Sequence, residues 1–513
     1  MLSVRTALRE HRTDAIICLL LVAATAMYLM LRRWPLGSSD EAYYFYHAIR
    51  MLDGEVLYRD VFELTTPFLM DVLALAFHLF GETFTTGRAV GSIIQALLTV
   101  AIYSGVRAVG AGRALAVAAA LLQLAIGQPA WPYTTPHWLA ILLVCALLLI
   151  SLDRQRARTT GWVVMQGLLL GLLLATRQHA GVAVGIGMVL LTFADALNDR
   201  LWERAPGLPL IGRVLTLAAA TLAGFGLVMG PHLMQAGVGP ILSQLVIYPL
   251  TGYRDTNQVT WSTNYLLNHE PFTWPALLKY LPLVVAITAL RAAVAWVRRY
   301  DRRTVETLLV LAVFGASAIA FTMAFPDLTH LAMIMPVLLI VAGELLTSVL
   351  GIAGRRGRFA QTALALALIV ACTVQLQRNY AGALTQYPIQ HYTQFGWLPF
   401  GKQSEVAVVE WVKGEVEKSV GRELLCYPGW SAIYLMTGAH NPTRHGLIFP
   451  GYQSDEEIQD VIETLEQKRV EHVLLVRSFI KPDDPVDAYV AQHYRCSGEL
   501  NLQLCARNDG DWY

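Results

Sequence analysis

Two adjacent carboxylates, Asp40 and Glu41, follow the first apolar segment of the chain in the stretch SSDEAYYFYHAIRMLDGEVLYRD. Tyr43, Tyr44 and Tyr46 come directly after them. A carboxylate held at a membrane surface can take a proton from an incoming hydroxyl group, as general-base catalysis requires. The plainer alternative is that the two acids begin a solvated surface helix. The tyrosines fit an interfacial aromatic belt as well as they fit stacking on a substrate.

The composition indicates a membrane protein. The chain has 513 residues, of which 55% are hydrophobic and 15% are charged, and its mean hydropathy is +0.46. Repeated apolar segments of about 20 residues predict several membrane-spanning helices. The first, residues 15–31, follows Arg5, Arg9 and Arg12 and is too long for a typical signal peptide. We therefore expect an uncleaved first span with a cytoplasmic N-terminus.

The arginines predict how the spans are oriented. Spans are expected at 15–31, 88–106, 114–130, 136–152, 161–176, 179–197, 211–234, 274–296, 304–325, 329–350 and 359–378, which makes eleven. Every second connecting loop is rich in arginine, whereas the loops WPYTTP and FPDLTH between them carry no Lys or Arg. The positive-inside rule places the basic loops in the cytoplasm. An odd number of spans then sends the C-terminus to the exoplasmic side.

One apolar segment, PFLMDVLALAFHLF from Pro67 to Phe80, is too short to be counted as a span. If it crossed the membrane, every later arginine cluster would move outside. We predict instead an interfacial helix that lies on the outer face. Residues 32–87 then form one large exoplasmic loop.

Glycines spaced four apart predict helix-packing faces in several spans. The pairs are Gly167 with Gly171, Gly181 with Gly185, and Gly226 with Gly230. The GIG at residues 185–187 is not a dinucleotide-binding loop, because it lacks the third glycine and lies inside an apolar span. The sequence also contains no P-loop motif for a nucleotide. Nothing in the pattern of basic residues indicates nucleic-acid binding.

The composition changes near residue 380, which predicts a transmembrane domain at 1–379 and an exoplasmic domain at 380–513. The aromatic stretch YPIQHYTQFGWLPF suits the membrane interface. Helices are then expected at 404–420, 430–436 and 455–468, strands at 423–427 and 472–477, and a hairpin at 494–507. Alternating strands and helices predict a small α/β domain. Arg444 and His445 are expected in a solvated loop of this domain, although they could contact an acceptor.

The six cysteines divide evenly between the two parts of the chain. Cys18, Cys145 and Cys372 lie in predicted spans, where they act as small apolar residues. In an oxidising compartment Cys496 and Cys505 could close the last hairpin, which leaves Cys426 without a partner. No cysteine or histidine spacing typical of a metal site is present.

A sugar attached through phosphate to a polyprenol would suit a base at the height of the lipid headgroups. Its phosphate is a good leaving group once a cation neutralises it, and no nucleotide is needed. The parity of the spans places Arg177, His179 and His330 at outer helix ends, and Arg254 in a long outer loop. Ionisable residues there are candidates for substrate binding. The alternatives are a snorkelling arginine, a histidine that caps a helix, and a solvated loop arginine.

The stretch SDEAYYFYHAIRMLDGEVLYRDVFELTTPFLMDVLALAFHLFGETFTTGRAVGSIIQALL resembles the first exoplasmic loop and second span of C-type (GT-C) glycosyltransferases. That family includes bacterial relatives of protein O-mannosyltransferases and the lipid A aminoarabinose transferases. The tail sequence SAIYLMTGAHNPTRHGLIFPG also resembles exoplasmic domains of bacterial members. The resemblance implies a polytopic α-helical fold with an odd number of spans and an exoplasmic C-terminal domain.

The resemblance also implies roles for individual residues. Asp40 matches the family's catalytic carboxylate, and Glu41 matches an acidic neighbour that helps to shape the site. Glu63 falls where relatives carry an acidic or histidine residue before a pair of prolines, but ELTTP has one proline and no lysine. Glu63 is predicted to shape the substrate site together with Tyr43, Tyr44 and Asp60 of the same loop and with His179 from the span count, while Asp60 and Glu63 fit a solvated loop equally well.

Together these features predict an inverting glycosyltransferase of the inner membrane that acts on its exoplasmic face. Its donor would be a polyprenyl-phosphate-linked sugar, and its acceptor a lipid, a polysaccharide or a protein. Arg177, His330 and Arg254 would hold the donor phosphate. Some relatives use a divalent metal, which the sequence neither requires nor excludes. The alternatives are a transporter or lipid flippase gated by the acids, and an inactive relative that serves as an assembly partner.

Overall fold

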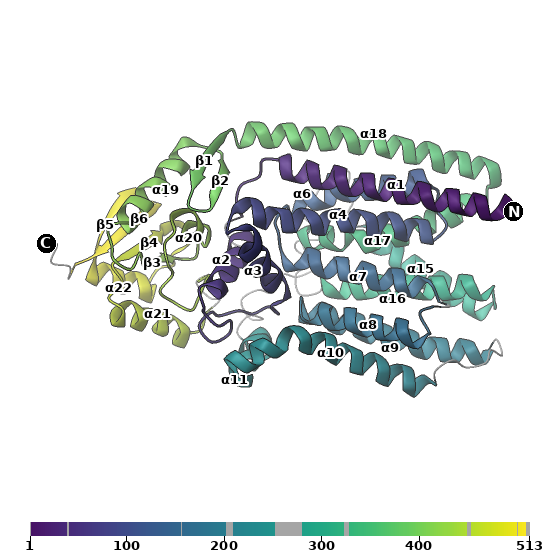
Figure 1. Ribbon diagram of the computed structural model, residues 1–513, viewed down its shortest axis with the longest axis horizontal. Coiled ribbons are helices and arrows are strands. Elements are labelled where there is room, and N and C mark those ends of the chain that lie inside the picture. Colours follow the sequence, from purple (N-terminus) through teal and green to yellow (C-terminus); the bar gives the residue numbers. More distant parts are fainter. Residues whose placement is uncertain are drawn as a thin grey trace.

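The chain forms an elongated molecule with a helical bundle at one end and a small sheet domain at the other (Figure 1). The computed structural model describes residues 2–37, 40–154, 156–201, 209–251, 280–322, 328–448, 453–499 and 501–508. Within these residues, eight helices are long and apolar enough to cross a membrane. The predicted polytopic α-helical fold with a C-terminal sheet domain is confirmed.

The bundle contains a helix at each of the eleven predicted spans, in the described part of each. The long helices are α1 (Leu2–Leu31), α4 (Phe84–Ala108), α9 (Gln178–Leu201), α10 (Leu210–Ala236), α16 (Arg302–Phe321), α17 (Leu328–Gly351) and α18 (Gly354–Gln386). An eighth consists of α5 (Arg113–Leu122), the π-helical turn η1 (Gln123–Gly127) and α6 (Gln128–Ala130). Three shorter apolar helices run beside them: α7 (Pro136–Leu152), α8 (Thr160–Leu174) and α15 (Pro282–Val297).

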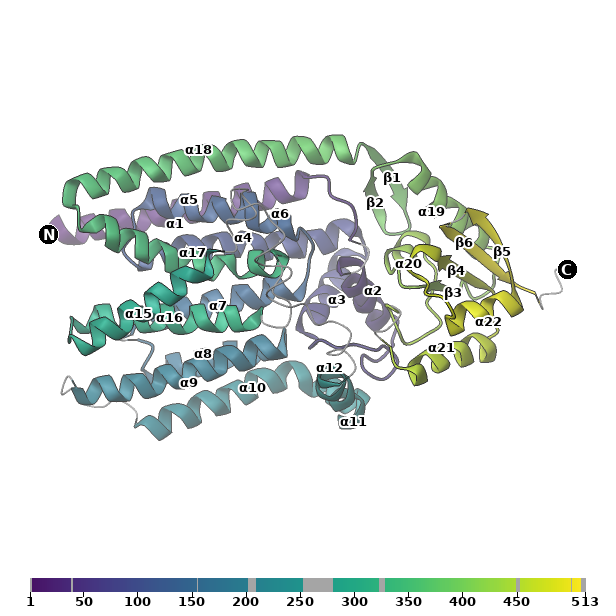
Figure 2. The same ribbon diagram turned by 180° about the vertical axis from the view of Figure 1, so that it is seen from behind.

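The first loop folds into α2 (Glu41–Leu52) and α3 (Phe68–Phe80), which lie at the end of the bundle next to the sheet domain (Figures 1 and 2). Because α3 does not run through the bundle, the parity of the spans is kept. One side of α3 is buried, with Leu69 and Leu73 at 0% exposure, whereas Leu79 and Phe80 are more than half exposed. This two-sided pattern is the one expected of an interfacial helix, and its depth in a membrane stays a prediction.

The arginine-rich connections gather at the opposite end of the bundle, where the N-terminus also lies (Figure 1). There Arg113 Nε donates to Asp14 Oδ1 at 2.7 Å. Arg158 Nη2 donates to Asp195 at 3.1 Å and to Glu306 at 2.5 Å. One end of the bundle is thus basic and the other carries the sheet domain, as the positive-inside pattern predicts.

Two of the three glycine pairs pack as predicted. A Cβ on Gly171 of α8 would lie 2.4 Å from the backbone oxygen of Thr221 in α10, so the two helix backbones are in close contact there. Gly181 and Gly185 face Leu174 and Leu170 of α8. The prediction for the third pair is wrong, because a Cβ on Gly226 or Gly230 would meet no described atom within 4 Å.

The C-terminal domain consists of helices around a small mixed sheet. After the hairpin β1 (Ile389–Thr393) and β2 (Gly396–Phe400), the sheet has the order β3-β4-β6-β5. The strands are β3 (Leu424–Tyr427), β4 (His472–Val476), β5 (Tyr494–Glu499) and β6 (Leu502–Arg507), and the helices are α19 (Gln403–Val416), α20 (Ala432–Thr437), α21 (Asp455–Gln467) and α22 (Pro485–His493). The hairpin β1–β2 and α22 were not predicted.

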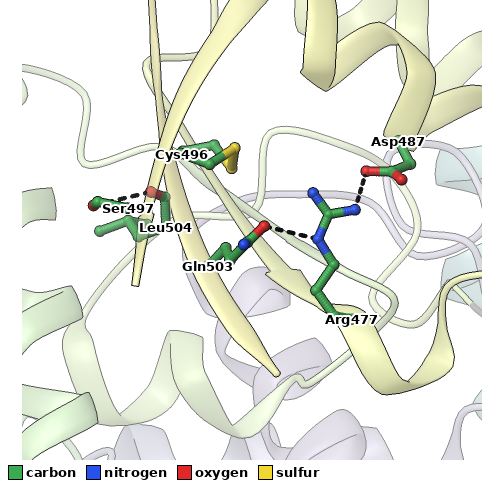
Figure 3. The surroundings of a disulfide bond; sticks show 7 residues. Arg477, Asp487, Cys496, Ser497, Gln503 and Leu504 are labelled. Atoms are coloured by element: carbon green, nitrogen blue, oxygen red, sulfur yellow. Dashed lines mark hydrogen bonds and ion pairs between the residues drawn. A yellow bond between two sulfur atoms is a disulfide. The ribbon is translucent and has the colours of Figure 1, made fainter. Parts of the chain in front are cut away.

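A disulfide joins Cys496 and Cys505, which are register partners on the neighbouring strands β5 and β6 (Figure 3). Arg477 lies beside this hairpin and connects it to α22, because it donates to Gln503 on β6 and to Asp487. Cys426 is buried and free. The pairing that the sequence allowed is therefore the one that forms.

The C-terminal domain docks directly on the first loop. The backbone N–H of Phe62 donates to the carbonyl of Arg444 at 2.8 Å, and the N–H of Asn441 donates to the Tyr46 hydroxyl at 2.8 Å. The Tyr46 ring stacks on Tyr434 with centroids 4.8 Å apart. His445 is only 1% exposed. The expectation that Arg444 and His445 occupy a solvated loop is wrong, because the segment is buried between the two parts of the molecule.

Candidate active site

Asp40 immediately precedes α2, at the end of the bundle that faces the C-terminal domain. It occupies the capping position of the helix, but its side chain makes no capping hydrogen bond. Burial raises the pKa of the Asp40 carboxyl group, and electrostatic interaction with Arg177 and His330 opposes this rise. A partly buried carboxylate that faces two basic side chains is suited to accept a proton.

Glu41 is fully buried, and its carboxylate is occupied by three donors. Arg88 Nη2 donates to it at 2.7 Å, the N–H of Thr134 at 2.9 Å and the N–H of Gly37 at 3.4 Å. These bonds connect the segment after α1, the start of α4 and the loop before α7. We predicted Glu41 as a catalytic residue together with Asp40, but these contacts suit a residue that positions Asp40. Arg88, which opens the second predicted span, forms an ion pair with the buried Glu41.

Arg177 lies between α8 and α9, within electrostatic range of Asp40. One of its terminal nitrogens donates to Nε2 of His137. Its Nε is buried and has no hydrogen-bond partner among the described residues. The guanidinium therefore keeps a donor for a further acceptor, such as a phosphate oxygen.

Three histidines surround Arg177. The rings of His137 and His330 have centroids 5.5 Å apart, and the rings of His137 and His179 both contact Phe321 at the end of α16. His179 is exposed, and its ring stacks on Phe321 at 5.1 Å. The structure thus brings together four residues that the sequence selected, Asp40, Arg177, His179 and His330. His137 is a fifth member of the cluster.

Helix starts converge on this cluster. His137 is the second residue of α7, Arg177 directly precedes α9, and His330 is the third residue of α17. The N-terminus of a helix carries a partial positive charge and favours an anion. Three such ends together with Arg177 create a region of positive electrostatic potential next to the carboxylate of Asp40.

His137 is the residue of this cluster that our reading of the sequence missed. The signal was present in WPYTTPHW, because the span count places residue 136 at an outer helix end and the loop before it carries no Lys or Arg. A histidine at the outer start of a span is a candidate by the same rule that selected His330. Proline at the first helical position fixes the start of α7 one residue before His137.

The predicted aromatic and acidic residues of the first loop form a buried network beside the cluster. Tyr43 and Tyr44 are 8% and 6% exposed, so they are not a surface belt. The Tyr43 ring lies 3.9 Å from that of His47, and His47 Nδ1 lies 3.0 Å from Glu63. Glu63 is fully buried and also accepts from the backbone and side chain of Thr65, at 2.7 Å each. These contacts make Glu63 a buried structural residue rather than part of a solvated loop.

Two further candidates lie elsewhere. Asp60 accepts from the N–H of Val56 at 2.9 Å and pairs with Arg59 at 2.7 Å, so it stabilises a surface turn away from the cluster. Arg254 lies outside the described residues, so its predicted role in holding the donor phosphate stays a prediction.

The cluster does not fit a divalent metal. A metal site needs several anionic or neutral ligands that converge on one point. Here the guanidinium of Arg177 lies among the histidines and donates to His137. No group of three or more possible metal ligands was found among the described residues. We assign no step to a metal.

An apolar cavity of about 790 Å³ opens next to the cluster. Its walls come from α9, α16, η2 (Ser243–Ile247) and α12 (Tyr248–Leu250). Gln178 and His179 line its outer end. The remaining lining is almost entirely apolar, with Val182, Ile186, Leu190, Leu245 and Val313 among its residues. A cavity with a hydrocarbon-like wall and a polar end, next in sequence to Arg177, matches a lipid that carries an anionic headgroup.

Comparison with known proteins gives a fold but no sequence family. No protein-family model matches the chain, and no curated protein sequence does. The structure is similar to ArnT from Cupriavidus metallidurans bound to undecaprenyl phosphate, with a TM-score of 0.56 and 16% identity over 96% of this chain and 97% of that one. Apo ArnT from the same organism gives a TM-score of 0.54 and 15% identity over 98% of both chains. The chain therefore has the GT-C fold of ArnT along nearly its whole length.

Proposed function

We propose that the protein is an inverting glycosyltransferase that takes its sugar from a polyprenyl phosphate and acts on the exoplasmic face of the inner membrane. One observation carries this proposal: Asp40 lies within electrostatic range of Arg177 and His330, whose helix starts meet at His137. The fold shared with ArnT supports it, since one of the two ArnT structures holds undecaprenyl phosphate. The arginine-rich connections lie at the end of the bundle opposite the site, and the positive-inside rule assigns that end to the cytoplasm. This supports an exoplasmic location for the site.

In this mechanism the acceptor hydroxyl lies against Asp40, whose carboxylate takes its proton as the oxygen attacks the anomeric carbon. The bond between that carbon and the phosphate oxygen breaks on the opposite face of the sugar. A single displacement of this kind inverts the anomeric configuration. Polyprenyl phosphate leaves with the bonding electrons, and Arg177, assisted by His330 and His179, stabilises its negative charge.

The donor's hydrocarbon would occupy the cavity between α9 and α16. Gln178 and His179 at its outer end are the residues directly after Arg177, so a phosphate bound there lies beside the guanidinium. His137 Nε2 accepts a hydrogen bond from Arg177 and holds the guanidinium in place. A cation whose donors are already oriented needs little reorganisation when the charge develops.

Deletion of the gene tests the function. We expect one sugar to disappear from envelope glycolipids, polysaccharides or glycoproteins, and the matching polyprenyl-phosphate sugar to accumulate. Both changes are measured by mass spectrometry of fractionated envelopes, and restoring the wild-type gene should reverse both. Loss of an unmodified lipid from the outer side, with every glycan unchanged, would favour the flippase alternative and contradict the transferase.

A further inference from the structure

A small polar cavity lies next to Arg88, between the segment after α1, the first turns of α4 and the start of α6. Its volume is about 20 Å³, and a particle the size of a water molecule needs about 10–15 Å³. The proposed transfer reaction makes no use of this cavity. Polar and aromatic residues form much of its wall: Arg32, Trp34, Arg88, Gln95, Gln128 and Tyr133.

Arg32, the first residue after α1, is a buried cation at only 8% exposure. Its Nη1 donates to Gln128 Oε1 at 3.2 Å, and its guanidinium lies 4.5 Å from the centroid of the Trp34 ring. Among the residues that the structure describes, no carboxylate pairs with Arg32, whereas the like charge of Arg88 acts on it. Burial of an unpaired charge is costly, so a negative charge in this cavity would stabilise the protein.

Three residues of the cavity wall carry a buried N–H group without a hydrogen-bond partner among the described residues. These groups are Nε of Arg32, Nε of Arg88 and Nε2 of Gln95. Gln95 is 4% exposed, so bulk water does not reach its side chain freely. The charged residues of the described wall are two arginines, and no carboxylate belongs to it. Guanidinium and amide N–H groups are the partners that an anion requires.

We propose that this cavity is a binding site for a monatomic anion, which is chloride in a physiological medium. The small volume excludes a phosphate or sulfate group with its oxygens. A water molecule would fit the volume, but it brings no charge to offset Arg32. Chloride satisfies both requirements, because it accepts from the three free donors and supplies the missing negative charge. This proposal does not depend on the transferase activity.

Arg88 connects the anion site to the segment that carries Asp40. Its Nη2 donates to Glu41 at 2.7 Å and to the carbonyl of Pro35 at 2.8 Å, whereas its Nε belongs to the cavity wall. An anion on Nε would hold the same guanidinium that holds Glu41, the residue next to Asp40. We therefore expect the anion to stabilise the fold around the start of α2.

Thermal unfolding of the purified full-length protein in detergent tests the proposal. Replacing about 100 mM sodium gluconate by sodium chloride at equal ionic strength should raise the Tm by about 2–5 °C. Bromide should act like chloride, whereas gluconate is too large for the cavity. Arg32→Gln should abolish the response to chloride. Arg33→Gln is the matched control and should keep it, because Arg33 donates to the carbonyl of Pro388 and does not line the cavity.

A second variant keeps the test decisive if Arg32→Gln does not fold. Gln95→Glu replaces a free amide of the cavity wall by a carboxylate and so supplies the negative charge from the protein itself. Its Tm in gluconate should reach that of the wild type in chloride, and chloride should then have no further effect.

Anomalous diffraction from crystals grown in bromide locates the ion. We expect a bromide peak within hydrogen-bond distance of Arg32 and Gln95. Absence of a peak there, together with an equal Tm in chloride and gluconate, would show that the cavity holds water and would overturn the proposal. A chloride response that is the same in wild type, Arg32→Gln and Gln95→Glu would also overturn it, because the effect would then arise elsewhere on the protein.

Discussion

At the scale of single residues, the two adjacent carboxylates differ in what surrounds them. Asp40 lies within electrostatic range of Arg177 and His330 and makes no capping hydrogen bond. Glu41 is enclosed by three donors, of which Arg88 carries the positive charge. Neighbours in sequence on a helix point in different directions, so one acid can serve the reaction while the other holds the helix start in place.

We expect Glu41→Gln to destabilise the protein, because it leaves Arg88, which is partly buried at 14% exposure, without its counter-charge. Breaking a buried pair on one side costs about 3 kcal/mol. Arg88→Gln should cost a similar amount, and the double variant should cost at least about 1 kcal/mol less than the sum of the two. Unfolding in detergent measures all three. Additive losses would show that Glu41 and Arg88 do not act as a pair.

Arg177→Gln is expected to weaken binding of undecaprenyl phosphate by about ten- to a hundredfold, since a hydrogen bond to a charged group contributes about 1.5–3 kcal/mol. The measurement is equilibrium binding to the purified protein. Arg59→Gln is the matched control, because Arg59 is 53% exposed and pairs only with its neighbour Asp60 among the described residues. If the two variants bind equally well, Arg177 does not hold the phosphate.

At the scale of elements, the outer starts of α7, α9 and α17 bring basic residues from distant parts of the chain to one place. Span parity made this predictable for Arg177, His179 and His330. It could not show which first-turn side chains face one another, because that depends on the rotation of each helix in the bundle. Asp60 was grouped with the site because it belongs to the first loop, but its contacts show that it stabilises a turn within that loop.

Helix packing predicts different effects for two glycines on neighbouring helices. Gly171→Ala places a methyl group 2.4 Å from the backbone of α10 and should destabilise the protein by about 1–3 kcal/mol. Gly226→Ala meets no described atom within 4 Å, and alanine favours helix, so stability should be unchanged or slightly higher. Thermal unfolding of the two variants in detergent compares them. Equal loss in both would contradict the packing of α8 on α10.

At the scale of the whole molecule, the C-terminal domain and the first loop share a buried interface. Most helices and strands of the domain were predictable from local patterns, but their docking was not. It depends on contacts between residues about 400 positions apart, such as Asn441 with Tyr46. His47 and His445 are both buried at this interface, and His47 Nε2 and both ring nitrogens of His445 have no hydrogen-bond partner among the described residues.

These histidines predict that acid destabilises the docked state. Burial lowers the pKa of His445 to about 3 and also lowers the pKa of His47, so the separated state binds protons more readily below the ordinary pKa of about 6.5. Stability is complete above that pH and falls as the pH decreases. At pH 5 His445 alone should cost about 2 kcal/mol. His445→Phe should reduce the pH dependence of the unfolding midpoint, whereas His391→Phe, at a surface pair, should not. Identical pH profiles for all three proteins would contradict this account.

The most direct test of the central claim is rescue of a deletion strain by Asp40→Asn. This variant keeps the size of the side chain and removes its ability to accept a proton. Wild type and variant are compared at equal membrane levels, and envelope glycans and polyprenyl-phosphate sugars are profiled by mass spectrometry. We predict that wild type restores the missing sugar, whereas with Asp40→Asn it stays absent and the donor accumulates. Full restoration by Asp40→Asn would show that Asp40 is not the catalytic base.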